Sequence, residues 1–157
     1  MDAMGTRVFL DFAYAFLADG YLRSCAFADG LRAVETGLVL AATSLNRPFA
    51  PELWHLKGKL LAGQSGLEES PKSRRRGGEP AARAEACFQR ALHLAGAAKA
   101  RSLELRAATS LARLWQRRGR AAEAGRLLSR VCDSFGAGSE SADLVEARAL
   151  MRDLAPH

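Results

Sequence analysis

Residues 14–37 read YAFLADGYLRSCAFADGLRAVETG, and residues 108–131 read ATSLARLWQRRGRAAEAGRLLSRV. The two stretches align without a gap, and their small or apolar residues fall at nine shared relative positions. Recurrence of this kind over a fixed length is typical of proteins built from repeated helical hairpins. In the first stretch the nine residues are Tyr14, Leu17, Ala18, Tyr21, Cys25, Phe27, Gly30, Val34 and Gly37; in the second they are Ala108, Leu111, Ala112, Trp115, Gly119, Ala121, Ala124, Leu128 and Val131.

The size of the residues at these positions has a mechanical reason. Two antiparallel helices approach closely only where small residues face each other, and larger side chains fill the space beside them. Ala18, Gly30 and Gly37 are expected to be such close-approach positions in the first stretch. The pattern therefore predicts a helix, a short turn and a second helix in each stretch.

A third hairpin is expected between these two. Its second helix is indicated by Ala84-x3-Phe88-x2-Ala91 and its first by Leu53-x2-Leu56-x3-Leu60. Residues 63–80, GQSGLEESPKSRRRGGEP, separate them and are rich in Gly, Pro and charge, which predicts an inserted flexible loop. We place the repeats at about 11–44, 50–98 and 105–138, within a single domain that covers residues 1–157.

The composition favours helices throughout. Ala and Leu, two strong helix formers, supply 31 and 23 of the 157 residues. At the C-terminal end, Ser141 precedes an amphipathic stretch and is expected to cap a helix that covers the last repeat. The sequence predicts an all-α fold, with no strand and with helices over about 6–24, 28–44, 50–62, 81–96, 100–118, 121–134 and 142–154.

The spacing of the repeats resembles the tetratricopeptide repeat over nearly the whole chain. The resemblance implies a solenoid of about three helical hairpins closed by a C-terminal capping helix over 142–154. Such a fold presents a concave face, and the first helices of its repeats line that face.

Four strings carry a closer resemblance: ELWHLKGKLL at 52–61, AEACFQRAL at 84–92, SLELRAATSLARLW at 102–115 and ADLVEARAL at 142–150. They are similar to the C-terminal repeat region of bacterial STAND-class predicted ATPases, often linked to class III adenylate or guanylate cyclase domains. The resemblance implies a cytoplasmic signalling protein whose chemistry lies upstream of its repeats. The chain has no Gly-x4-Gly-Lys-Ser/Thr string, since Leu60 follows Gly58-Lys59, so ATPase or cyclase activity is not expected of it.

No pattern of catalytic or metal-ligating residues stands out. His55, His93 and His157 are scattered, and Cys25, Cys87 and Cys132 lie far apart without a Cys-x2-Cys spacing. Unpaired thiols suit a reducing cytoplasm. We expect no catalytic residue, no metal and no cofactor, and no stretch is apolar enough to predict a membrane helix.

Basic residues are concentrated in the third repeat. The whole chain carries a net charge of +6, and the span 101–130 alone carries eight Arg against two Glu. In the repeat alignment five polar residues fall on the expected concave side, and three of these are arginines on one helix face. We hypothesise that this surface binds a peptide carboxylate; a solvated basic face is the alternative, and the sequence alone favours it. The residues are Arg106, Thr109, Arg113, Gln116 and Arg117.

Two further regions bear on partners. Apolar residues crowd the N-terminal helix, and we hypothesise that this end docks on preceding repeats or on a second copy: Val8, Phe9, Leu10, Phe12, Phe16 and Leu17. The block Lys72–Arg76 lies in the inserted loop and is expected to be solvated.

The leading functional hypothesis is a non-catalytic protein-interaction or regulatory scaffold with a protein or peptide partner; the alternative is a basic helical nucleic-acid-binding protein.

Overall fold

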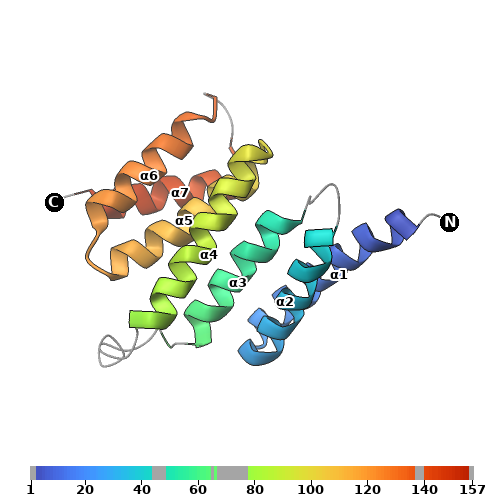
Figure 1. Cartoon of the computed structure of the whole chain (residues 1–157). Coiled ribbons are helices and arrows are strands. Elements are labelled where there is room, and N and C mark those ends of the chain that lie inside the picture. The colour runs from blue at the N-terminus through green and yellow to red at the C-terminus, as the bar shows by residue number, and fades with distance from the viewer. Residues whose placement is uncertain (1–2, 44–48, 65, 67–77, 137–139, 156–157) are drawn as a thin grey trace. The chain divides into compact units, whose positions relative to one another are not determined.

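The computed structural model describes residues 3–43, 49–64, 66, 78–136 and 140–155. Within these residues the chain forms seven α-helices and no strand (Figure 1), which confirms the all-α prediction. The helices are α1 (Ala3–Arg23), α2 (Phe27–Thr43), α3 (Ala50–Gln64), α4 (Gly78–Ala97), α5 (Arg101–Arg117), α6 (Ala121–Asp133) and α7 (Ala142–Leu154).

The helix ends differ from the prediction by up to three residues, at the start of α1 and around the expected loop 63–80. Helix α3 continues to Gln64 and α4 already begins at Gly78. Pro80 is the third residue of α4, within the first turn, where its missing N–H removes no helical hydrogen bond. The expected loop is therefore shorter at both ends, and Lys72–Arg76 lie outside the described residues.

The contacts of the chain divide it into two compact units, Met1–Ala91 and Leu92–His157, with the division inside α4. We describe each unit by itself. That residues 1–157 form a single domain stays a prediction.

In the first unit, α1 packs against α2, and α3 contacts both of them. Small residues allow this close packing. A Cβ added to Gly30 would lie 2.5 Å from the Leu60 side chain, and one added to Gly37 would lie 2.9 Å from Cβ of Tyr14. Ala18 is fully buried. The close-approach positions expected from the sequence are thus contact points between helices.

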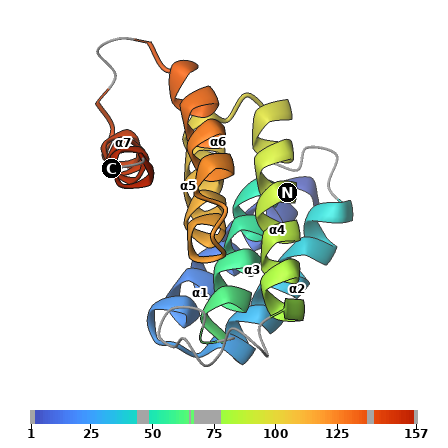
Figure 2. The ribbon, with the colours of Figure 1, turned by 90° about the vertical axis from the view of Figure 1, so that its left-hand side faces the viewer.

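In the second unit, α5 packs against α6, and α7 contacts both of them. Figure 2 views α7 nearly end-on while α5 and α6 run upright, so α7 lies across the pair. Leucines that are almost fully buried lie on all three helices: Leu105, Leu111, Leu128 and Leu144.

The α1–α2 and α5–α6 turns have the same backbone geometry at equivalent positions of the alignment. Cys25 and Gly119 both have positive φ, 57° and 78°. The next residue donates to the carbonyl of the residue five positions earlier: Ala26 N–H to Tyr21 at 2.9 Å, and Arg120 N–H to Trp115 at 2.8 Å. A single residue in the left-handed conformation, followed by this hydrogen bond, is a common way for an α-helix to end. The sequence alignment of the two stretches is therefore matched by their local structure.

Candidate functional site

Helix α5 presents the arginines that the sequence singled out. Arg106 and Arg113 are two turns apart, and Arg117 follows one turn later, so all three lie on one side of the helix. The side chains of Arg106 and Arg113 are 42% and 48% exposed, and Arg117 is exposed. We call these three residues the arginine row.

Two members of the arginine row hold carboxylates of α7. The Nη2 atom of Arg113 lies 2.7 Å from Oε1 of Glu146, and Nε of Arg106 lies 3.6 Å from Oδ2 of Asp143. The first distance is that of a charge-assisted hydrogen bond, while the second is a longer ionic contact. The row can thus bind carboxylates borne by a helix, and in this structure a segment of the same chain supplies them.

The other two predicted site residues differ in exposure. Thr109 is buried, and its hydroxyl donates to the Leu105 carbonyl of its own helix at 2.8 Å. Thr109 therefore adds no exposed surface to the row. Gln116 is exposed at the C-terminal end of α5, beside Arg117.

The carboxylate partners of the arginine row, Asp143 and Glu146, are not among the site residues predicted from the sequence. The sequence does indicate that the two acids form a pair, because Asp143 and Glu146 are three residues apart and therefore share one side of α7. Which helix would face α5 depends on tertiary packing, and this is not contained in the local pattern.

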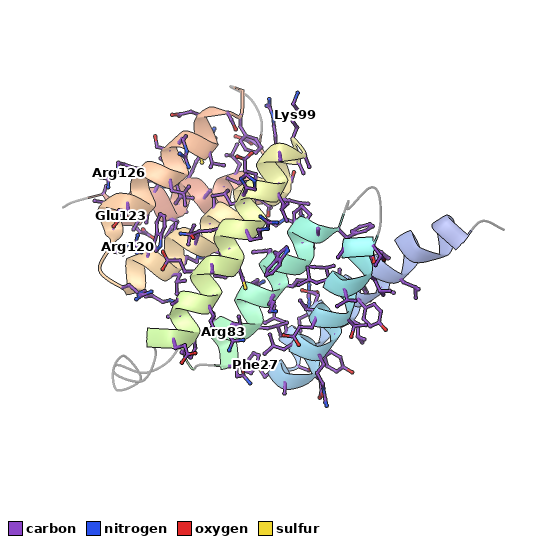
Figure 3. All side chains as sticks on the ribbon, in the orientation of Figure 1. Phe27, Arg83, Lys99, Arg120, Glu123 and Arg126 are labelled. Carbon is purple, nitrogen blue, oxygen red and sulfur yellow. The ribbon has the colours of Figure 1, made fainter. Side chains whose placement is uncertain are left out.

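A second charged cluster lies at the turn after α5. The Arg120 guanidinium stacks on the Trp115 ring at 4.6 Å from its centroid. Its Nε and Nη2 atoms donate to the two carboxylate oxygens of Glu123 at 2.8 and 2.7 Å. Figure 3 shows Arg120 and Glu123 together near the start of α6. These hydrogen bonds hold the pKa of the Glu123 carboxyl below its usual value.

The N-terminal helix exposes apolar side chains, as the sequence analysis expected. Phe16 is 74% exposed and Phe12 is 51% exposed, while Asp11, the residue before Phe12, is fully buried. Phe12 also contacts Phe49, with ring centroids 5.5 Å apart. Leu10 and Leu17 are exposed as well. The side chains of Val8 and Phe9 lie outside the described residues.

The three thiols and His55 are packing or surface groups, and His157 lies outside the described residues. Cys87 and Cys132 are buried, and burial raises the pKa of both thiols, whereas Cys25 is exposed. His55 is buried beside the Phe88 ring. Among the residues that the structure describes, no three His, Cys, Asp or Glu side chains gather closely enough to hold a metal ion.

No protein-family model, curated protein or solved structure matches the chain. None of the helices in the described parts of the chain has the length and apolarity that crossing a bilayer requires.

Proposed function

We propose that the chain is a non-catalytic protein-interaction module of the tetratricopeptide type, and that its arginine row binds an acidic segment of a protein partner. One observation carries the proposal: Arg113 and Arg106 already bind two carboxylates of a helix. The guanidinium group is suited to this role, since it donates parallel hydrogen bonds to carboxylate oxygens.

The repeat geometry supports the same proposal. The α1–α2 and α5–α6 hairpins end their first helices in the same way, at Cys25 and Gly119. Both also begin their second helix with the same bond, from Gly30 N–H to Ala26 and from Ala124 N–H to Arg120. Repeated hairpins of this kind commonly build binding surfaces for other proteins. A role in signalling, next to an ATPase or cyclase domain, is part of this proposal and rests on the sequence resemblance.

A selection experiment tests the proposed function. The full chain, immobilised, is used to select binders from a random-peptide phage library, and we expect enrichment of acidic peptides. The matched control is the double variant Arg113→Glu with Glu146→Arg, which keeps an ion pair between α5 and α7 but reverses the charge at the centre of the row. This variant should no longer select acidic peptides.

The same preparation distinguishes the alternative function. Enrichment of peptides without an acidic bias, together with tight and steeply salt-dependent binding of a DNA duplex, would favour a nucleic-acid-binding protein. The structure pairs Arg106, Arg113 and Arg120 with carboxylates, which reduces the positive charge available to phosphates. The protein partner is therefore the function that we put forward.

A further inference from the structure

We infer that α7 is an internal ligand of the arginine row, and that the partner is an acidic amphipathic helix which binds by displacing it. The inference rests on the proposed function and names the class of partner. It is carried by the charges, the burial pattern and the placement of α7 in the second unit.

The charges of α7 complement those of α5. Asp143 and Glu146 meet Arg106 and Arg113, while the basic residues of α7, Arg148 and Arg152, are exposed. An incoming helix needs carboxylates three residues apart to make the same two contacts. The acidic face of α7 is therefore a template for the partner.

The apolar residues of α7 define the rest of the template. Leu144, Ala147 and Leu150 are buried and lie at intervals of three residues, so they form one stripe beside the two carboxylates. The opposite side is partly open to solvent, with Val145 55% exposed. The partner helix should thus carry leucine-sized residues next to its acidic pair.

The attachment of α7 is of a kind that a competitor can replace. It has 13 residues, and only Leu144, Ala147 and Leu150 are buried. The Arg113 and Glu146 side chains are 48% and 47% exposed, so water screens the ion pair between them. Short helices with few buried contacts are the segments that open locally in folded proteins. Such opening would uncover the arginine row. Because only the molecules with α7 detached could bind a partner, the apparent affinity would be lower than the affinity of the uncovered row.

The test compares three full-length chains as receptors for one probe, a fluorescein-labelled peptide of residues 140–155. The first is the unaltered chain. The second, the opened chain, carries Asp143→Lys and Glu146→Lys, which removes the internal carboxylates but leaves α5 unchanged. The third carries Glu140→Lys and Asp153→Lys, which change the net charge by the same amount. Both residues are exposed and form no ion pair with any residue that the structure describes.

We expect the opened chain to bind the peptide at least tenfold more tightly than the other two, measured by fluorescence anisotropy. Adding Arg113→Glu to the opened chain should abolish binding. Equal affinity of all three chains would overturn the inference about α7 and leave the proposed function standing. Absence of binding to every chain would overturn the proposed function as well.

A fourth chain keeps the test decisive if the opened chain does not fold. It exchanges the charges of both pairs, with Arg106→Asp, Arg113→Glu, Asp143→Arg and Glu146→Arg, so that α7 stays attached. A peptide of residues 140–155 with Lys in place of Asp143 and Glu146 should now compete with α7 better than the acidic peptide does. Unchanged preference for the acidic peptide would overturn the inference.

Discussion

The Phe88 ring of α4 lies directly against the backbone of Gly58 in α3. A Cβ added to Gly58 would lie 2.5 Å from the ring, and Phe88 is only 3% exposed, so the ring has little room to move. The absence of a side chain at Gly58 is thus what allows α3 and α4 to pack in the first unit.

Gly58→Ala should consequently destabilise the chain, although alanine is the better helix former. Overpacking in a buried contact costs about 1–3 kcal/mol, which exceeds the gain in helix propensity of roughly 1 kcal/mol. Urea denaturation followed by circular dichroism measures the difference. Gly20→Ala is the matched control, since nothing lies within 4 Å of a Cβ there, and it should raise the free energy of unfolding.

The two helix-ending residues with positive φ, Cys25 and Gly119, should respond to substitution in opposite ways. Cys25 adopts φ 57° with a side chain, whereas glycine occupies the equivalent position 119. Because this conformation costs a non-glycine residue about 1–2 kcal/mol, Cys25→Gly should raise the free energy of unfolding by about 1 kcal/mol and Gly119→Ala should lower it by a similar amount. Thermal melts of the two variants should shift in opposite directions; shifts in the same direction would refute the shared turn geometry.

Glu123 makes part of the stability depend on pH. Its pKa is lowered by the hydrogen bonds from Arg120, so the folded state favours the ionised carboxylate. The stabilisation is present above the pKa of the unfolded chain, about 4.3, and is lost as the pH falls through the lower folded pKa. The difference in unfolding free energy between the unaltered chain and Glu123→Gln should shrink below about pH 4. In an Arg120→Ala background this pH dependence should disappear.

The three thiols should react at different rates. Cys25 is exposed, whereas Cys87 and Cys132 are buried with raised thiol pKa values, and only the thiolate is nucleophilic. Ellman's reagent at pH 8 should modify one thiol quickly and the other two only after denaturant is added. Three equal rates in the native chain would argue against the burial of Cys87 in α4 and Cys132 in α6.

Much of the local structure could be predicted from the sequence because it depends on neighbouring residues. The periodic apolar residues placed all seven helices, and the alignment of Cys25 with Gly119 anticipated two turns of the same geometry. The predicted start of α4 at about residue 81 is three residues too late, because a proline is as compatible with a loop as with a first helical turn.

The candidate site was predicted only in part. Helical spacing was enough to place Arg106, Arg113 and Arg117 on one side of α5. It could not show that Thr109 would be buried, or that Asp143 and Glu146 would reach the row. The two carboxylate contacts depend on how α7 packs against α5, and contacts between helices distant in sequence are not encoded in the period of either helix.

The most direct test of the account is to locate the bound peptide by nuclear magnetic resonance. The opened chain, labelled with ¹⁵N, is titrated with the peptide of residues 140–155, and the Nε–Hε signals of the arginines are followed. We predict that the signals of Arg106 and Arg113 shift first and by the largest amount, while those of Arg23 and Arg32 in the first unit stay in place. Saturable binding that leaves the Arg106 and Arg113 signals unmoved would contradict it.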